Sequence, residues 1–250
     1  MGARFQDRAI LVTGSTRGIG RAIAQALWAE GAVVGLHGRT REAADRACAE
    51  LTGGSAERCH PLVADFSRPE TAAALVREFA DRAGRLDGLV NNAGAGKAVA
   101  FRGLTAAAWG MTMAVNLEAP VWAAREAYIR MRAAGAGAIV NIASLAAHGP
   151  GKWMGADYAA AKAGLVSLTR SLAFEAARFG VRVNAVSPGF VETEMTAVLT
   201  PEMRAGLGIP LGRLARPDEV AGPVMYLLSE AAAYLTGEVL HVDGGLWMKG

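Results

Sequence analysis

The sequence of 250 residues is poor in the side chains that cross-link small folds or bind metals, with two cysteines and four histidines. Cys48 and Cys59 form no CxxC pair, and two cysteines do not make a disulfide framework in a chain this long. The histidines lie far apart in the sequence, without ligand spacing, so we expect no metal site. A reducing cytoplasm is the compartment that this composition favours.

The sequence also lacks long hydrophobic runs, a cleavage-site pattern near its start and a myristoylation signal. We therefore expect no membrane partner. The chain also lacks a strong net charge of either sign, because 26 basic and 23 acidic residues leave a formal net charge of +3. So small a charge argues against nucleic acid as a partner, and the arginines within residues 39–46 are interpreted as a solvated helix face.

What the sequence does contain is a regular alternation of two hydrophobic patterns. Strand-like apolar runs occur at 9–13, 32–37, 60–64, 87–91, 137–144, 181–187 and 238–242. Helical patterns lie between most of them, as at 18–30, 41–52 and 69–83. Such alternation requires crossover connections and a parallel sheet with helices on both faces. With no linker or composition break, we expect one α/β domain over residues 1–250, a Rossmann-type doubly wound sheet of about seven parallel strands.

A glycine-rich turn follows the first apolar run, in the segment TGSTRGIG at 13–20. Gly14, Gly18 and Gly20 there would allow a tight turn and bring a pyrophosphate close to the N–H groups at a helix N-terminus. The spacing is G-x-x-x-G-x-G and differs from the G-x-G-x-x-G of the commoner dinucleotide fingerprint. Taken alone, these glycines could serve only to make the turn.

Tyr158 and Lys162 stand four residues apart in a helical pattern, and hence on one helix face. A neighbouring ammonium favours the phenolate and lowers the tyrosine pKa toward a useful acid–base range. Ser144 ends the preceding apolar run, where the ligands of open α/β sheets bind. A lone Y-x-x-x-K pair occurs by chance on many helices. The pair therefore indicates a catalytic role only in combination with the other motifs of the chain.

Together these segments resemble the short-chain dehydrogenase/reductase family over nearly the whole chain. The resemblance rests on TGSTRGIG at 13–20, NNAG at 91–94, VN at 115–116, Ser144, YAAAK at 158–162 and PGFVET at 188–193. Within the family, VSPGFVETEMTAVL, PLGRLARPDEVA and YLTGEVLHVDGG are similar to the 3-oxoacyl-[acyl-carrier-protein] reductases.

The resemblance implies roles at matching positions. Tyr158 would donate the proton to a carbonyl oxygen that Ser144 orients. Lys162 would lower the Tyr158 pKa and hold ribose hydroxyls, and Asn116 would support a proton relay through water. The residues implied to bind the cofactor are Gly14, Ser15, Arg17, Gly18, Ile19, Gly20, Arg39, Asp65, Phe66, Asn91, Ala93, Gly94, Tyr158, Lys162, Pro188, Gly189, Val191 and Thr193. Asn91 and Asn116 could instead be turn or helix-end residues, and Asp65 a helix cap.

The loop between Ser144 and Tyr158 departs from the reductase pattern. The two residues are 158 − 144 = 14 positions apart, one more than the resemblance leads us to expect. His148, Trp153 and Met154 in this loop are interpreted, together with Ser144, as substrate-lining residues. A loop that packs only on its own domain is the alternative.

The segment LHGRT at 36–40 predicts the choice of cofactor. A carboxylate about twenty residues after the glycine turn usually binds the ribose 2′-hydroxyl of NAD, but here Gly38 and Arg39 stand in its place. Arg39, with Arg17 in the turn, could bind a 2′-phosphate through charge-assisted hydrogen bonds. We therefore expect NADP(H), the alternative being that both arginines are solvated surface charges.

The leading hypothesis is an NADPH-dependent carbonyl reductase acting on a 3-oxoacyl thioester, carried on acyl carrier protein or coenzyme A, as in fatty acid biosynthesis. A dehydrogenase of a sugar, polyol or other small secondary alcohol is the second hypothesis. A non-catalytic dinucleotide sensor is the third, although binding alone does not require the full set of reactive residues. The resemblance further implies a homotetramer.

Overall fold

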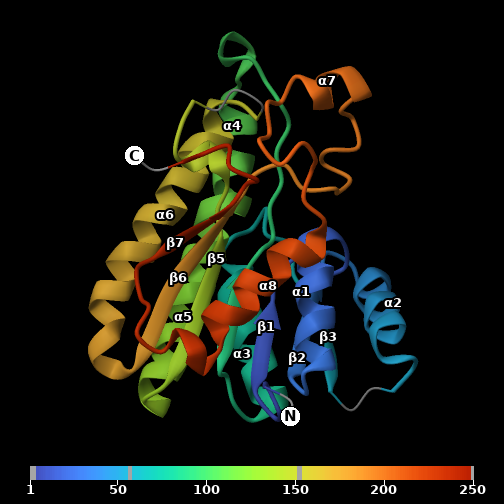
Figure 1. Cartoon of the computed structure of the whole chain (residues 1–250). Coiled ribbons are helices and arrows are strands. Elements are labelled where there is room, and N and C mark those ends of the chain that lie inside the picture. Colours follow the sequence, from blue (N-terminus) through green and yellow to red (C-terminus); the bar gives the residue numbers. More distant parts are fainter. Residues whose placement is uncertain (1–3, 56–57, 151–153, 249–250) are drawn as a thin grey trace.

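The computed structural model describes residues 4–55, 58–150 and 154–248. Their strands form one parallel sheet of seven strands in the order β3-β2-β1-β4-β5-β6-β7 (Figure 1). The strands are β1 (Ala9–Val12), β2 (Val33–Gly38), β3 (Cys59–Val63), β4 (Gly88–Asn91), β5 (Gly137–Ile142), β6 (Val181–Pro188) and β7 (Val239–Val242). Each lies within or beside an apolar run of the sequence, so the predicted fold class is confirmed.

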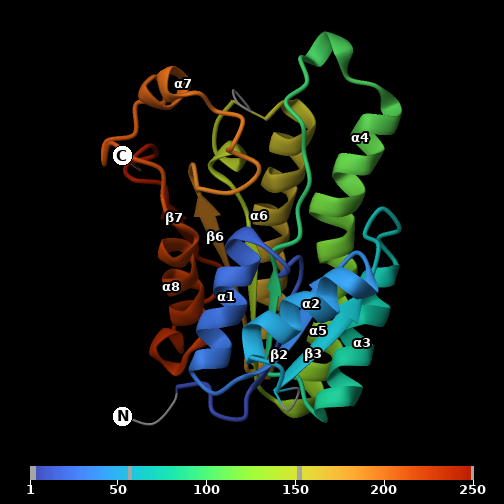
Figure 2. The same ribbon diagram turned by 90° about the vertical axis from the view of Figure 1, so that its right-hand side faces the viewer.

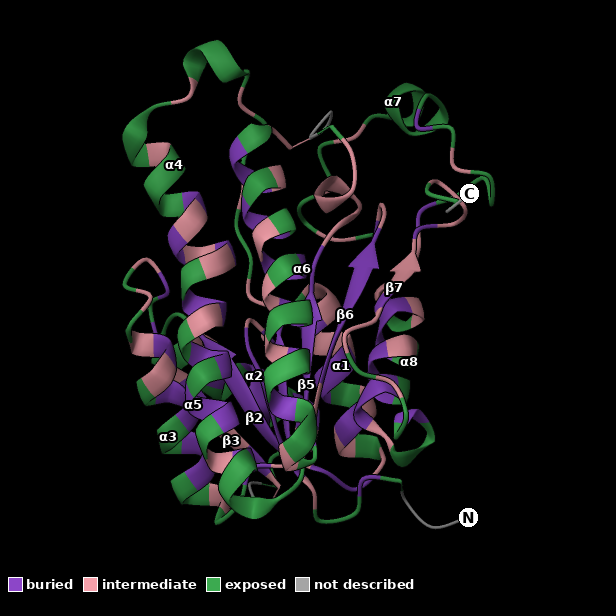
Figure 3. Cartoon of the chain, turned by 90° about the vertical axis from the view of Figure 1, so that its left-hand side faces the viewer, coloured by how far each residue is buried: buried purple, intermediate pink, exposed green. Residues whose placement is uncertain are grey.

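Helices cover both faces of this sheet (Figures 1 and 2). They are α1 (Gly18–Ala29), α2 (Arg41–Thr52), α3 (Thr71–Ala83), α4 (Ala106–Met113), α5 (Ala119–Ala134), α6 (Ala156–Ala176), α7 (Pro201–Ala205) and α8 (Pro217–Leu228). One hydrophobic cluster joins α1, α2 and α8 to one face of the sheet, and a second joins α3, α5 and the end of α6 to the other. The central strands are buried on both faces, as parallel strands require (Figure 3).

Helix boundaries follow local backbone chemistry. Gly53 and Gly84 adopt left-handed conformations, with φ of 62° and 72°, and end α2 and α3. The pattern at 69–83 becomes helical only from Thr71, and the pattern at 18–30 ends at Ala29. Among the helices built from the described residues, none has the length and apolar character of a membrane-spanning segment.

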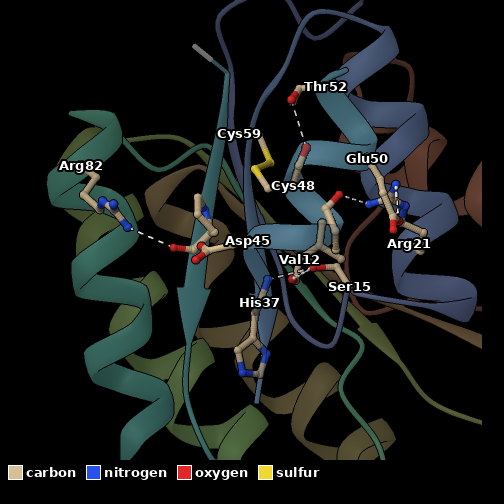
Figure 4. The surroundings of a disulfide bond; sticks show 12 residues. Val12, Ser15, Arg21, His37, Asp45, Cys48, Glu50, Thr52, Cys59 and Arg82 are labelled. Carbon is tan, nitrogen blue, oxygen red and sulfur yellow. Dashed lines mark hydrogen bonds and ion pairs between the residues drawn. A yellow bond between two sulfur atoms is a disulfide. The ribbon is translucent and has the colours of Figure 1, made fainter. Parts of the chain in front are cut away.

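The sequence did not predict a link between the two cysteines, but the structure contains one. A disulfide joins Cys48 near the end of α2 to Cys59 at the start of β3, with the Cα atoms 6.1 Å apart (Figure 4). The chain turns back between these elements, so residues eleven apart in sequence meet in the core. Because disulfides are uncommon in reducing compartments, cysteine usage no longer supports a cytoplasmic location.

The order of the strands places a topological switch point between β1 and β4. The chain runs outward from β1 through β2 to β3, and then returns to place β4 on the other side of β1. The crossover helices therefore diverge at the carboxyl ends of β1 and β4, which is where open α/β sheets bind ligands. The glycine turn follows β1 and NNAG follows β4, so the fold brings these two motifs together.

Candidate active and cofactor-binding site

The glycine turn is closely packed against the segment after β4. Gly14 has a φ of +62°, and a Cβ atom on it would lie 2.7 Å from the Cα of Ala93. A Cβ on Gly20 would lie 2.4 Å from the carbonyl oxygen of Gly14. Both contacts involve backbone atoms that cannot rotate away, so both positions require glycine.

The N-terminus of α1 has the properties of an anion site. Its N-cap, Arg17, makes no capping hydrogen bond with its side chain, and the first turn contains no acidic residue. The first N–H groups of a helix lack partners within the helix and carry a partial positive charge. With the glycine cradle beside them, these groups fit the pyrophosphate of a dinucleotide.

Arg17 also links the turn to the loop after β6. Its guanidinium forms an ion pair with Glu194, and both side chains are largely exposed. Beside this pair, a Cβ on Gly18 would lie 3.4 Å from the methyl group of Thr193. Thr193, the last residue of PGFVET, thus lies beside the glycine turn, although it is 193 − 17 = 176 positions from Arg17 in the sequence.

The end of β2 has the features expected from LHGRT. Gly38 is the last residue of β2, and a Cβ on it would lie 2.8 Å from the methyl group of Thr16. Arg39 is exposed and, among the residues that the structure describes, belongs to no ion pair. Its positive charge is therefore available at the place where an NAD site would have a carboxylate.

Asp65 follows β3 and serves its own turn. Its carboxylate accepts hydrogen bonds from the backbone N–H and the hydroxyl of Ser67, at 3.0 and 2.8 Å. These bonds, with smaller contributions from the charges of Arg68 and Arg39, lower the pKa of Asp65. Both oxygens thus have local partners in the turn after β3, and Asp65 is not a helix cap, because the N-cap of α3 is Glu70. Phe66, the next residue, is buried.

Ser144 and Tyr158 meet at the carboxyl end of β5. The strand ends at Ile142, two residues earlier than the sequence pattern indicated, and Ser144 caps the 3-10 turn that follows it. Its hydroxyl oxygen accepts from the N–H of Ala146 at 3.2 Å. Tyr158 lies in the first turns of α6 and hydrogen-bonds with the Ser144 side chain. A hydroxyl pair able to bind one carbonyl oxygen results.

Lys162 lies beside Tyr158 but does not lower its pKa in this structure. The ammonium group donates to the carbonyl of Ile142 at 2.8 Å and lies 5.7 Å from the centroid of the tyrosine ring. Burial raises the pKa of Tyr158, with the Ser144 hydrogen bond as a smaller opposing effect. Burial also lowers the pKa of Lys162 to about 8. The expected direction for Tyr158 is corrected because desolvation is the largest influence on its pKa and the Lys162 ammonium is not among the causes of the shift.

Asn116 is fully buried in a π-helical turn, Ala114–Glu118, between α4 and α5. Its amide nitrogen donates to the carbonyls of Ala95 at 2.6 Å and Thr112 at 2.9 Å. A Cβ on Gly94 would lie 3.1 Å from the Asn116 side-chain oxygen and 3.7 Å from the Lys162 nitrogen. Asn116 is thus close to Lys162 and is not a helix-end residue.

Asn91 belongs to a buried chain of polar side chains. Its amide donates to Asn141 at 2.9 Å, and the Asn141 amide donates to the hydroxyl of Thr169 on α6, also at 2.9 Å. The Asn91 side-chain oxygen is buried and has no hydrogen-bond partner among the described residues. This chain fixes β4 and β5 against the helix that carries Tyr158.

The residues interpreted as substrate-lining lie in different surroundings. The side-chain nitrogen Nε2 of His148 lies 2.8 Å from the hydroxyl of Ser187, and its ring centroid lies 4.4 Å from that of His241. Met154 lies near Tyr158, since a Cβ on Gly96 would lie 2.9 Å from the Met154 methyl and 3.0 Å from the tyrosine ring. Trp153 lies outside the described residues.

The remaining predicted positions are in the backbone frame of the site. Pro188 ends β6, and a Cβ on Gly189 would lie 2.9 Å from the Cα of Asp243. Val191 forms a bridge with Ala215. Ser15 donates to the carbonyl of Val12 at 2.7 Å, and Ile19 packs against the core.

Three polar residues near the site were missed from the sequence. Thr13 accepts from the N–H groups of Asn92 at 2.9 Å and Ala93 at 3.0 Å, and the Asn92 amide donates to the carbonyl of Gly14 at 3.0 Å. His37 accepts from the N–H of Gly14 at 2.9 Å. The signal for His37 was a polar ring within the apolar run at 32–37, and the signal for Asn92 was its place within NNAG.

Among the described residues, no group of three or more His, Cys, Asp or Glu side chains could hold a metal ion.

Comparisons with known proteins show the family of the chain. A family model described as enoyl-(acyl carrier protein) reductase matches residues 14–247. The 3-oxoacyl-[acyl-carrier-protein] reductase FabG of Aquifex aeolicus is 39% identical over 249 residues, covering 99% of this chain and 100% of that protein. The cis-4-hydroxycyclohexanecarboxylate dehydrogenase of Sinomonas cyclohexanicum is 40% identical over 248 residues, covering 98% of each.

A solved structure extends the similarity to the fold. The crystal structure of 3-oxoacyl-[acyl-carrier protein] reductase from Brucella melitensis is 33% identical, has a TM-score of 0.92, and covers 99% of this chain and 94% of that one. The chain therefore belongs to the short-chain dehydrogenase/reductase family of oxidoreductases.

Proposed function

We propose that this protein is an NADPH-dependent carbonyl reductase that converts a 3-oxoacyl thioester to the 3-hydroxyacyl thioester. The observation that carries the proposal is the pairing of Ser144 with a buried Tyr158 beside Lys162. Identities of 39% to the Aquifex reductase and 33% to the Brucella reductase support the substrate class. The acyl group would be carried on acyl carrier protein or coenzyme A.

The proposed reactive residues have separate roles in the reduction. A bound reduced nicotinamide dinucleotide would supply hydride to the carbonyl carbon. The Ser144 hydroxyl would hold the carbonyl oxygen, and the Tyr158 hydroxyl would donate its proton to that oxygen as negative charge develops there. Burial keeps the tyrosine protonated at neutral pH, because it raises the pKa of Tyr158. A protonated tyrosine suits reduction better than oxidation, which needs the phenolate.

Preference for NADPH is supported by charge at the end of β2. Arg39 is exposed there, and no acidic side chain occupies residues 35–41. Arg17 already has Glu194 as its partner, so Arg39 is the stronger candidate for the 2′-phosphate. A guanidinium offers this group paired, charge-assisted hydrogen bonds.

A second candidate function is the oxidation or reduction of a small secondary alcohol or ketone, such as a sugar, a polyol or a ring alcohol. The observation that favours it is 40% identity to a cis-4-hydroxycyclohexanecarboxylate dehydrogenase over 98% of each chain. A non-catalytic dinucleotide sensor is disfavoured because such a sensor needs neither Tyr158 nor Ser144. A cytoplasmic location and a homotetramer complete the proposal.

One NADPH-oxidation screen separates these functions. Purified protein would be assayed with acetoacetyl thioesters of coenzyme A and acyl carrier protein, simple and cyclic ketones, quinones and sugar-derived ketones. We expect the highest kcat/KM with an acetoacetyl thioester. A higher kcat/KM with a cyclic or sugar-derived ketone would replace the proposed substrate class, and NADPH binding without turnover of any carbonyl would support the sensor.

A further inference from the structure

The imidazole of His37 is buried within the proposed cofactor site, and His37 has no role in the proposed chemistry. It lies in β2, and its exposed fraction is 2%. The ring stacks on Phe66, with centroids 4.5 Å apart and planes 25° apart. Figure 4 shows the ring pointing away from the disulfide at the other end of the sheet. No metal-binding group surrounds it among the described residues.

The hydrogen bonds of the ring define its protonation state. The backbone N–H of Gly14 donates to Nδ1 at 2.9 Å, and a backbone N–H can only donate. Nε2 lies 3.1 Å from the carbonyl oxygen of Ala64, which can only accept. The ring is therefore the neutral tautomer with its proton on Nε2. A second proton on Nδ1 would face the Gly14 N–H, donor against donor.

The backbone of His37 holds the same turn. Its N–H donates to the hydroxyl of Ser15 at 2.9 Å, and its carbonyl accepts from the N–H of Ser15 at 3.0 Å. Gly14 is thus held through its N–H by the His37 ring and through its carbonyl by the amide of Asn92 at 3.0 Å. Gly14 keeps a left-handed conformation between these two contacts.

We propose that His37 is a positioning residue of the cofactor site, which holds the Gly14 amide through Nδ1 and so orients the glycine turn for the pyrophosphate. The inference rests on the proposed function, because it assumes a nicotinamide dinucleotide at this turn. His37 links three segments around the adenine half of that site: the turn after β1, the end of β2, and Ala64 with Phe66 after β3. It acts through Gly14 and need not touch the reacting atoms.

Two conservative substitutions separate the two ring bonds. The side-chain oxygen in His37→Asn occupies the position of Nδ1, so this variant keeps an acceptor for Gly14 and loses the donor to Ala64. His37→Gln reaches the position of Nε2 with its amide, so it keeps the donor to Ala64 and loses the acceptor. His37→Phe keeps the stacking ring and loses both. His60→Phe is the matched control, since His60 is a half-buried histidine of β3 edge-on to Phe79.

The test is titration of each variant with NADP⁺ by isothermal calorimetry, with kcat and the KM for NADPH measured beside it. We expect His37→Phe and His37→Gln to bind about tenfold more weakly and His37→Asn to stay within about threefold of the parent. We also expect kcat to change much less than KM in all three, and His60→Phe to bind like the parent.

Thermal unfolding of every variant separates positioning from packing. His37→Asn and His37→Gln each lose one ring hydrogen bond, so a purely structural role would weaken binding equally in both. Equal weakening, or parent-like binding by His37→Phe, would overturn the inference. A parent that binds NADP⁺ but reduces no carbonyl would defeat the proposed function alone, and one that binds no dinucleotide would defeat both.

Discussion

Burial sets the direction of the pKa shifts of Tyr158 and Lys162 on α6. It disfavours the charged form of each group, so it raises the pKa of Tyr158 and lowers that of Lys162 to about 8. At neutral pH the tyrosine therefore holds its proton, and the lysine keeps a hydrogen bond to the carbonyl of Ile142. This state is the one that proton donation to a carbonyl requires.

Removal of the Tyr158 hydroxyl should nearly abolish turnover. Tyr158→Phe keeps the ring but removes the proposed acid, whose contribution is about 10²–10⁴-fold in rate, while NADPH affinity should stay within a few-fold. Steady-state kinetics and NADPH titration check both parts. Tyr128→Phe is the control, because the buried Tyr128 hydroxyl has no partner among the described residues. A near-normal rate in Tyr158→Phe would mean that the acid is misassigned.

Lys162→Ala should impair both turnover and cofactor binding, because Lys162 lies against Tyr158 and is proposed to hold ribose hydroxyls. Steady-state kinetics and NADPH titration distinguish the role of Lys162 beside the tyrosine from its role in cofactor binding. Loss of turnover with parent-like NADPH binding would leave Lys162 with only its contact to the tyrosine.

Cofactor preference should respond to two residues at the end of β2. Arg39→Ala should lower kcat/KM for NADPH more than for NADH, because it removes the cation proposed for the 2′-phosphate. Gly38→Asp should shift preference toward NADH by repelling that phosphate. Because a Cβ on Gly38 would meet the Thr16 methyl at 2.8 Å, Gly38→Asp is best made with Thr16→Ser, and Thr16→Ser alone is the control. Equal or better efficiency with NADH in the parent contradicts the prediction.

Among the elements, the segments after β1 and β3 and the end of β2 are joined by the neutral ring of His37 at the proposed cofactor site. Burial lowers the pKa of His37 to about 4, whereas an unfolded histidine titrates near 6.5. Between these values the unfolded chain binds a proton that the folded chain does not, so stability falls as pH falls from about 6.5 to about 4. The charged side chains of the adjoining segments, Arg39, Asp65 and Arg68, are all exposed.

His37→Asn should therefore reduce the acid sensitivity of the fold. The loss of unfolding free energy between pH 7 and pH 4.5 should shrink by about 2–3 kcal/mol, since one pKa unit corresponds to about 1.4 kcal/mol. Urea unfolding of parent and variant at both pH values measures this change in free energy. His60 is present in both proteins, so its contribution cancels in the comparison. An unchanged difference would show that His37 titrates alike in the folded and unfolded chains.

At the scale of the whole molecule, apolar side chains remain exposed on α6 and in the C-terminal tail. Phe174 on α6 is 91% exposed and Met248 in the tail is 75% exposed. Figure 3 shows the exposed face of α6 along the side of the molecule. Exposed apolar groups of this kind commonly mark contacts between copies of a chain.

We expect light scattering at micromolar concentration to give four times the chain mass of 25.9 kDa. Phe174→Asp should shift the mass toward smaller species, because it places a charge in the proposed contact. Phe101→Asp is the control, since Phe101 is 77% exposed at a different place, before α4. A parent protein that scatters as a monomer would contradict the tetramer.

The sequence by itself determined the features that depend on neighbours along the chain. Strands follow from apolar runs, the cradle from Gly14 and Gly20, and the common face of Tyr158 and Lys162 from a four-residue spacing. Each rests on local periodicity or on a backbone conformation open mainly to glycine.

Only the tertiary structure decided features that join distant residues. The Arg17–Glu194 pair, the disulfide at Cys59 and the contact of His37 with Gly14 depend on how crossovers bring segments together. The direction of the Tyr158 pKa depends on burial, which is a property of the packed molecule and not of a four-residue spacing. A four-residue spacing can place the Lys162 ammonium beside the Tyr158 hydroxyl. The direction in which the tyrosine pKa shifts is set by the solvent that the tyrosine loses on folding.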